Sequence, residues 1–507
     1  MERIHFNRDE YLDKVLGCWA GKNIGGTLGG PLEGKREVFH YDFYVNPMDG
    51  EPLPNDDLDL QLVWLRAMED RGVYGVDERV LGEYWMAHIV AAWNEYGVGQ
   101  ANIRNGFFPP LSGRVNNDEW KNSNGAWIRS EIWACVLPGA PDEAASFAWC
   151  DACVDHTDDG VWAEMFTASM ESAAFVESDL RKIIECGLAR IPEDCRVARS
   201  VRLAIAEYDA GHDFVAARNA VVEDSKDLGW FQAPANVAFA VIGLLYGEGD
   251  FGKSICTAVN CGDDTDCTGA TVGAVFGILH GFKAIPAKWI DPIGHTIKTV
   301  AVNPFQLDAP KTLEDLTRRT RILMERAGTE NPALAELVDG PTVISAGIRE
   351  ELGNAWRTKN RESALKTNRL RFDVPWGGIG VEYLDADGPV VEPGKPVNIR
   401  LSAEGCILET RSVFFRWRLP EGWTAPEGTE RAVMVRTWFR TEIDSVFVPA
   451  AAMGAFEYLA LEVRLSDRQA SILLTVPFER KRAVETGHFT WDHRFQSGSD
   501  RRGATLR

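Results

Sequence analysis

The residues that could do chemistry gather in two acidic clusters, each at the start of a segment with helical spacing of apolar residues. The first cluster lies in PNDDLDLQLVWL, where Asn55, Asp56 and Asp57 precede the apolar run and Asp59 follows within one turn. Acids at a helix N-terminus can cap the helix and complement its dipole without any catalytic role. Capping and metal binding are therefore both open for this cluster taken by itself.

The second cluster lies in VNCGDDTDCTGATVGAVFGILHG and contains Asp263, Asp264 and Asp266. Like charges this close together repel one another unless a cation or strong hydrogen-bond donors compensate them. The small residues that follow predict a helix that packs closely against a neighbour and holds the cluster rigidly. A metal ion and a solvated acidic turn are both compatible with the second cluster taken by itself.

Together, the two clusters favour a two-metal hydrolytic site with Asp56, Asp57, Asp264 and Asp266 as its core ligands. Carboxylate oxygens are hard ligands that suit Mg²⁺ or Mn²⁺ and do not suit zinc. Two such ions about 3.5–4 Å apart can orient substrate hydroxyl groups and activate a water molecule. We therefore expect two divalent cations as cofactors, Mg²⁺ before Mn²⁺.

The elements that must position these clusters change in character along the chain. Up to about residue 365, segments with apolar residues three and four apart, such as EAASFAWCDACVDH and APANVAFAVIGLLYG, predict helices. After Leu370, short runs such as RSVFFRWRL and ASILLTVPF, separated by turn residues, predict a β-sandwich. We expect a mainly helical protein, with a helical domain over 1–365, a β-sandwich over 366–485 and a C-terminal tail over 486–507.

Composition narrows the classes of function. The formal net charge of -21 argues against direct binding of nucleic acid, which needs a basic face. No apolar stretch is long enough to span a membrane and the N-terminal segment lacks the apolar centre of a signal peptide, so we expect a cytoplasmic protein without membrane contact. The ten cysteines are sparse and irregularly spaced, which indicates reduced thiols, and the C-x-x-C of Cys150 and Cys153 is typical of helix packing.

Five short motifs follow one another through most of the first 285 residues. They are the segment GCWAGKNIGGTLGGPLEG with Glu33, then Asn55-Asp56-Asp57, Ser123-Asn124-Gly125-Ala126, Asp155-His156 and Asp264-Thr265-Asp266-Cys267. In this order they resemble the ADP-ribosylglycohydrolase family, which has a Pro-x-Glu element, a Thr-Asp-Asp metal motif, a Ser-Asn-Gly-Ala loop, a Ser-His helix end and a final Asp-x-Asp-Thr motif.

The resemblance implies an orthogonal all-helical bundle with a binuclear Mg²⁺ or Mn²⁺ centre, which cleaves an N- or O-glycosidic bond to ribose. It implies catalytic roles for Glu33, as general base or gate, and for Asp57. It implies that Ser123, Asn124, Gly125 and His156 bind substrate, and that the metal ligands are Asn55, Asp56, Asp57, Asp264, Asp266 and Cys267. From the residues alone, the Ser-Asn-Gly loop could be an ordinary turn and His156 could cap its helix.

Two positions depart from the family pattern, because Asn55 and Cys267 stand where the family has threonine. An asparagine still offers a carbonyl oxygen to a metal ion, whereas a thiol is a soft partner for Mg²⁺. Thr265, Thr268 or a water molecule could complete the second metal shell in place of Cys267, and the site could then prefer Mn²⁺.

The C-terminal β-domain is a further departure, since compact members of the family lack it. We expect it to serve as a recognition module, a lid or the contact of a homodimer. The substrate could accordingly be an ADP-ribosylated molecule or a smaller glycoside. Two other functions stay open from the sequence: a two-metal nucleotide phosphohydrolase, and a binding or structural protein that kept the fold and lost the reaction.

Overall fold

The structure is a computed structural model that describes residues 3–355, 358, 365–405, 410–437 and 439–483. It contains two compact units. One is helical and comprises Met1–Gly97 and Glu119–Leu365, and the other is rich in β-structure and comprises Val98–Asp118 and Lys366–Phe489. The predicted tail over 486–507 lies outside the described residues.

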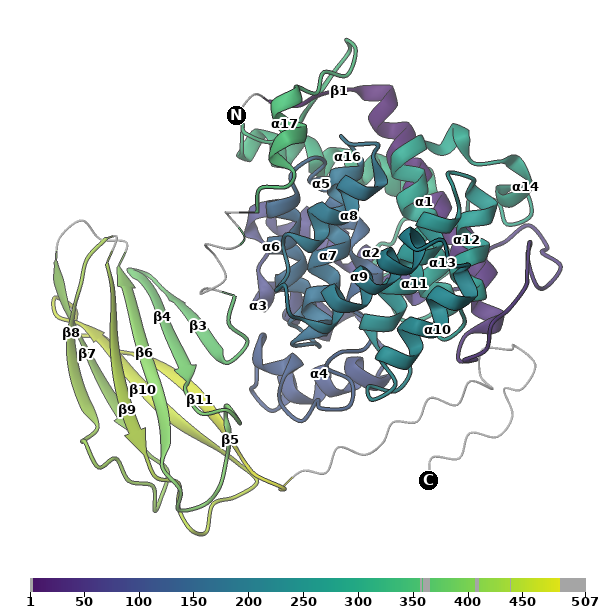
Figure 1. Ribbon diagram of the computed structural model, residues 1–507. Helices are drawn as coiled ribbons and strands as arrows, with labels where there is room; N and C mark the ends of the chain where they lie inside the picture. Colours follow the sequence, from purple (N-terminus) through teal and green to yellow (C-terminus); the bar gives the residue numbers. More distant parts are fainter. Residues whose placement is uncertain (1–2, 356–357, 359–364, 406–409, 438, 484–507) are drawn as a thin grey trace. The chain divides into compact units, whose positions relative to one another are not determined.

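Helices dominate the first part of the chain, as Figure 1 shows. They are α1 (Arg8–Gly29), α2 (Asp56–Arg71), α3 (Glu78–His88), α4 (Asn94–Arg104), α5 (Glu131–Val136), α6 (Pro141–Ala152), α7 (Asp159–Ala174), α8 (Leu180–Leu188), α9 (Arg196–Asp209), α10 (Phe214–Asp224), α11 (Ala233–Tyr246), α12 (Phe251–Asn260), α13 (Thr265–His280), α14 (Ala287–Ile290), α15 (Pro304–Leu307), α16 (Leu313–Glu330) and α17 (Ala346–Glu351). A short parallel pair, β1 (His5–Asn7) and β2 (Glu336–Val338), joins the N-terminus to the segment that follows α16.

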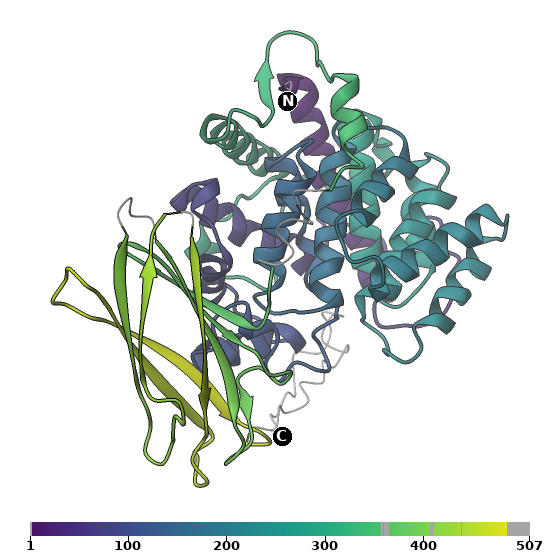
Figure 2. The same ribbon diagram turned by 60° about the vertical axis from the view of Figure 1, so that its left-hand side comes forward.

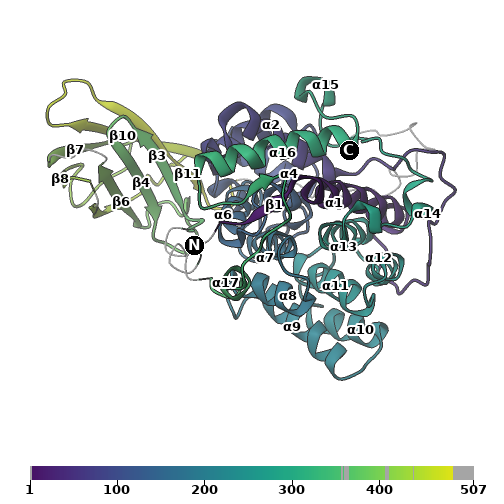
Figure 3. The ribbon, with the colours of Figure 1, turned by 90° about the horizontal axis from the view of Figure 1, so that it is seen from above.

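The centre of the helical unit is the pair α1 and α13, which lie side by side (Figure 3). Their backbones touch at a series of glycines. A Cβ atom placed on Gly21 would lie 2.0 Å from the carbonyl oxygen of Gly273, and one on Gly25 would lie 2.0 Å from that of Gly269. The small residues after the second acidic cluster therefore allow α13 to pack against α1 without intervening side chains, and this fixes the start of α13 relative to the end of α1.

The β-rich unit contains a four-stranded and a five-stranded sheet (Figure 2). The first has the order β3-β4-β6-β9 and the second the order β5-β11-β10-β7-β8. The strands are β3 (Arg369–Val374), β4 (Gly377–Tyr383), β5 (Val390–Val391), β6 (Val397–Gly405), β7 (Arg411–Arg418), β8 (Glu430–Val435), β9 (Arg440–Phe447), β10 (Phe456–Leu465) and β11 (Ile472–Arg480). Buried residues alternate with exposed ones along β7, which is the pattern of a sheet with one buried face. The predicted fold, a helical bundle followed by a β-sandwich, is confirmed.

The core of the β-unit includes side chains from a segment that the sequence alone assigns to the helical domain. Phe107, Leu111 and Val115, all from Val98–Asp118, are buried in one cluster with residues of both sheets. In addition, Asn116 Nδ2 donates a hydrogen bond to Glu479 Oε2 at 2.7 Å. The β-unit is therefore built from two separate stretches of the chain.

Among the described residues, no helix combines the length and the hydropathy needed to cross a membrane.

Candidate active site

The two acidic clusters begin α2 and α13. At α2 the capping residue is Asn55, whose side-chain Oδ1 accepts a hydrogen bond from the backbone N–H of Asp57 at 2.7 Å. The structure thus gives Asn55 the capping role that the sequence left open. At α13 the residue in the N-cap position is Asp264, and its side chain makes no capping hydrogen bond within the helix. Its neighbour Asp263 instead accepts a hydrogen bond from the backbone N–H of Phe231 at 3.1 Å.

Carboxylates from both clusters converge into two overlapping sets of ligand atoms. One set is Glu33, Asp264 and Asp266, and the other is Asp57, Asp266 and Cys267. Within each set the ligand atoms lie within 4.8 Å of one another, and Asp266 belongs to both. This arrangement has the composition of a bridged pair of cation sites.

Buried carboxylate oxygens without a hydrogen bond support the same interpretation. Within the part of the chain that the structure describes, Asp57 Oδ2 and Asp266 Oδ1 are buried without a hydrogen-bond partner. A buried carboxylate oxygen without a partner is costly, whereas a divalent cation would satisfy it. The donor set therefore fits divalent cations, with one purely oxygen-lined position and one that includes a thiol.

The proximity of these carboxylates changes their ionisation. Burial, followed by the charge of Asp266, raises the pKa of Asp56 to about 6. Burial, followed by the charges of Asp266 and Glu33, raises the pKa of Asp264 well above its usual range. Both shifts reflect negative charge crowded into a space of low polarity, and a bound cation would reverse them.

The thiol of Cys267, in α13, contacts Asp57. Its Sγ donates a hydrogen bond to Asp57 Oδ1 at 3.4 Å. The two threonines that could have replaced it are engaged elsewhere, because Thr265 Oγ1 donates to the carbonyl oxygen of Gly29 and Thr268 Oγ1 donates to that of Thr265. The departure at Cys267 therefore falls at the candidate cation position itself.

A buried lysine supports Asp57 from the other side. Lys22 of α1 is 1% exposed, and its Nζ lies 2.7 Å from Glu131 Oε1 and 3.7 Å from Asp57 Oδ2. Burial disfavours the ammonium ion, but the charges of Glu131 and Asp57 outweigh burial and raise the pKa of Lys22. Lys22 was not predicted as a site residue, and its signal in the sequence is a lysine that is the sole charged residue of the segment GCWAGKNIGG.

The Ser-Asn-Gly loop lines a cavity together with the carboxylates. Ser123, Asn124 and Gly125 share this cavity with Glu33, Asp56, Asp264, Asp266 and Cys267. Asn124 Nδ2 donates a hydrogen bond to Asp264 Oδ2 at 2.7 Å, and its Oδ1 accepts one from Trp127 Nε1 at 2.9 Å. The loop is thus hydrogen-bonded directly to the second acidic cluster. Four of the five motifs contribute residues to this cavity: the motif with Glu33, the motif with Asp56, the Ser-Asn-Gly loop and the second acidic cluster.

Comparison with known proteins shows the family to which the chain belongs. A sequence model described as ADP-ribosylglycohydrolase matches residues 7–331. The chain belongs to the ADP-ribosylglycohydrolase family. This confirms the predicted family. It also confirms the predicted class of enzyme, a glycosidic hydrolase.

Two further proteins are similar to this chain. ADP-ribosylarginine hydrolase Tri1 of Serratia proteamaculans (strain 568) is 35% identical over 54 residues, which span 11% of this chain and 15% of that relative. A solved chain described as an ADP-ribosylglycohydrolase-related protein complex has a TM-score of 0.43 and 20% sequence identity, covering 62% of this chain and 99% of its own.

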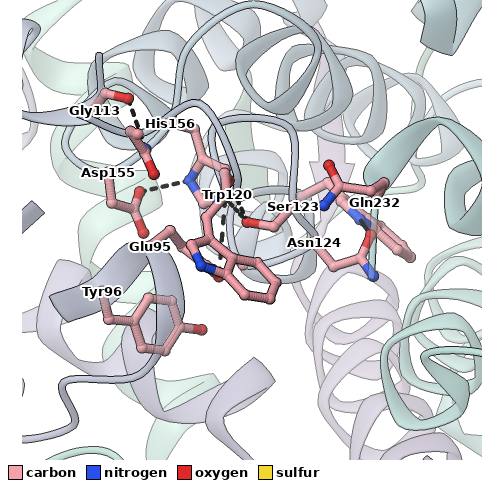
Figure 4. Close-up of polar contacts among 12 residues, drawn as sticks. Glu95, Tyr96, Gly113, Trp120, Ser123, Asn124, Asp155, His156 and Gln232 are labelled. Atoms are coloured by element: carbon pink, nitrogen blue, oxygen red, sulfur yellow. Dashed lines mark hydrogen bonds and ion pairs between the residues drawn. The ribbon is translucent and has the colours of Figure 1, made fainter. Parts of the chain in front are cut away.

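His156 contacts the Ser-Asn-Gly loop. It is fully buried, its Nε2 is 3.0 Å from Ser123 Oγ, and its Nδ1 is 2.8 Å from Asp155 Oδ1 (Figure 4). Arg129 in turn pairs with Asp155 at 2.7 Å. The imidazole thus contacts Ser123 and Asp155, and His156 is not among the residues that line the cavity.

Two cavity residues from the start of α4 were missed by the sequence analysis. Tyr96 donates a hydrogen bond from its hydroxyl group to Asp56 Oδ2 at 2.9 Å. Glu95 lines the cavity with a side chain that is almost fully buried. The segment WNEYG that carries them has no feature that separates it from an ordinary helix start. Asp57, by contrast, is fully buried and is not among the residues that line this cavity.

Proposed function

We propose that this chain is a binuclear Mg²⁺- or Mn²⁺-dependent hydrolase that cleaves an N- or O-glycosidic bond to ribose. The observation that carries the proposal is the sharing of Asp266 between two sets of ligand side chains, one of them containing Glu33, beside the Ser-Asn-Gly loop. Family membership supplies the glycosidic class of the reaction. The bridged ligand sets support the metal dependence.

Different residues of the chain would have different roles in such a reaction. Glu33, Asp264 and Asp266 would hold one cation, and Asp57, Asp266 and Cys267 the other. When bound, the cations would supply Lewis-acid chemistry and orient the hydroxyl groups of the ribose.

Glu33 is the candidate general base. It lines the cavity, and it lies among the carboxylates without being fully buried. Its carboxylate would accept the proton of the water molecule that attacks the anomeric carbon. The loop from Ser123 to Gly125, tied to Asp264 through Asn124, would fix the ribose relative to this carboxylate.

The proposed substrate class is an ADP-ribosylated molecule. Support comes from the name of the family and from the name of the bacterial relative, an ADP-ribosylarginine hydrolase. The loop adds small side chains and backbone N–H groups of the kind that accommodate a diphosphate. A smaller riboside is the competing substrate, and a nucleotide phosphate ester would place the chain among two-metal phosphohydrolases.

Product analysis tests the proposal. The purified full chain is incubated with ADP-ribosylated peptides, simple ribosides and nucleotides, in the presence of Mg²⁺, of Mn²⁺ and of a chelator. We expect release of ADP-ribose or ribose that depends on the cation. We expect Asp264→Asn to abolish this release, whereas Asp227→Asn, at an exposed ion pair with Arg196, leaves it unchanged.

Other products would overturn the proposal in defined ways. Release of inorganic phosphate or of a nucleoside monophosphate would make the chain a phosphohydrolase. Binding of both cations without turnover of any compound would make it a binding protein on the same fold.

A further inference from the structure

Glu95 is a second cavity glutamate, outside both sets of ligand side chains. Its side chain is 6% exposed, and it lines the cavity together with Glu33, Asp56 and the Ser-Asn-Gly loop. Among the described residues, its Oε2 atom has no hydrogen-bond partner. The protein supplies this buried carboxyl oxygen with no hydrogen bond, which disfavours the ionised form of the carboxyl group.

The surroundings of Glu95 hold its carboxyl group in one place. A Cβ atom added to Gly125 would lie 2.2 Å from Glu95 Oε1, so the loop glycine leaves the space that this carboxyl group occupies. His156 Nε2 lies 4.0 Å from the same oxygen, and His156 is itself fixed by Asp155 (Figure 4). The carboxyl group is therefore positioned by the same loop that is proposed to hold the ribose.

Burial favours the protonated form of Glu95. Burial raises the pKa of Glu95 to about 7, and His156 lowers it and Asp155 raises it by smaller amounts. Tyr96, the next residue of α4, contributes a phenol whose pKa burial raises well above the usual range. A carboxylic acid that is partly protonated near neutral pH can donate a proton and regain it.

The reaction requires such a donor. When the bond between the anomeric carbon and the leaving atom breaks, the electron pair stays on the leaving atom, which must gain a proton if it is a poor leaving group. The attacking water forms the new bond to the anomeric carbon and loses one proton. Hydrolysis of a glycosidic bond thus needs one group that accepts a proton and another that donates one.

We propose that Glu95 is the general acid of this enzyme and transfers its carboxyl proton to the leaving atom, while Glu33 accepts the proton of the attacking water. This assignment rests on the glycosidic hydrolysis proposed above. One proton enters at the leaving atom and one departs from the water, so Glu95 ends as a carboxylate and Glu33 as a carboxylic acid. Exchange with solvent returns both groups to their starting states.

The test compares two substrates whose leaving groups differ in their need for a proton. Wild type, Glu95→Gln, Glu95→Asp and the exposed control Glu83→Gln are assayed on an ADP-ribosylated peptide, whose leaving group needs a proton, and on a nitrophenyl riboside, whose leaving group departs as an anion. For Glu95→Gln we expect kcat on the peptide to fall by about 10²–10⁴-fold, with activity on the nitrophenyl compound retained within about threefold. We also expect the loss of the alkaline limb of the pH profile, partial recovery in Glu95→Asp, and Mg²⁺ binding by calorimetry equal to that of the wild type.

Three other outcomes would contradict the proposed role of Glu95. Equal losses on both substrates would show that Glu95 positions the substrate or the loop and does not donate a proton. Unchanged activity on both would remove Glu95 from the reaction. If the wild type turned over neither substrate, the proposed glycosidic hydrolysis would itself fail, and the assignment of Glu95 with it.

Discussion

The Cys267 thiol donates a hydrogen bond to Asp57 Oδ1 at 3.4 Å, and both residues belong to one of the two candidate cation positions. The other position, made by Glu33, Asp264 and Asp266, offers only oxygen atoms. A soft thiol and a hard carboxylate differ in the cations that they prefer. The two positions are therefore chemically unequal, and this difference can be measured.

Replacing the thiol with a hydroxyl group should favour Mg²⁺. We expect Cys267→Ser to bind Mg²⁺ about tenfold more tightly at its weaker site, because a hard oxygen replaces the sulfur. The soft probe Cd²⁺ should bind the wild type better and give ultraviolet thiolate-to-metal absorption that the variant lacks. Titration calorimetry measures both affinities, with Cys267→Ala as the control. Equal Mg²⁺ affinities of the serine and alanine variants would mean that this side chain does not contact a cation.

Asp56 and Asp59 lie three residues apart in α2. We expect loss of the Asp56 charge to lower turnover and loss of the Asp59 charge to lower stability. Asp56 lines the cavity, whereas Asp59 Oδ2 accepts hydrogen bonds from the backbone N–H groups of Val300 and Ala301 at 2.6 and 2.7 Å. We expect Asp56→Asn to lower kcat by at least about 10²-fold with little change in Tm. Asp59→Asn should cost roughly 2 kcal/mol of stability, because it weakens two charge-assisted hydrogen bonds, and should retain the kcat of the folded protein.

Thermal unfolding and kinetics on the same samples separate these effects. A loss of stability in Asp56→Asn without a loss of turnover would reverse the roles assigned to the two aspartates.

Much of the site follows from local sequence, and some of it depends on tertiary packing. The acidic residues that begin α2 and α13 can be recognised from the sequence. Several neighbouring carboxylates repel one another, and this predicts a cation or hydrogen-bond donors beside them. Asn55 shows the limit of that reasoning, since either a cap or a ligand fits its sequence context, and only the 2.7 Å hydrogen bond to the Asp57 N–H reveals the cap.

Lys22 and Glu95 could not be found in this way. Each is a single charged residue whose burial depends on elements distant in the sequence: Glu131 beside Lys22, and the Ser123 and His156 region beside Glu95. For the same reason, the packing of Phe107 against the sheets of the β-unit leaves no local signature. Apolar spacing reports which residues are buried, but it does not report which core buries them.

The glycine contact between α1 and α13 predicts a structural dependence of the site. A Cβ atom on Gly273 would lie 2.1 Å from the carbonyl oxygen of Gly21, so Gly273→Ala must push the two helices apart. Since α13 carries Asp264 and Asp266 at its start, we expect a loss of more than about 3 kcal/mol in stability together with weaker cation binding. Gly340→Ala is the control, because an added Cβ there meets no atom within 4 Å. A Gly273→Ala protein with unchanged Tm would contradict the close backbone contact.

Glu95 should also alter the dependence of stability on pH. Its pKa is raised by burial from 4.5 to about 7, so between these values the folded state binds more protons than the unfolded state. Stability therefore falls as pH rises through this range, by roughly 3 kcal/mol for a shift of this size. A glutamine cannot ionise and escapes the penalty. Measured in chelator, the Tm of Glu95→Gln relative to the wild type should rise between about pH 5 and pH 8, whereas the exposed Glu83→Gln should show the same difference at both pH values. A pH-independent difference for Glu95→Gln would mean that the buried carboxyl group ionises as readily as an exposed one, and it would remove the electrostatic support for its role as an acid.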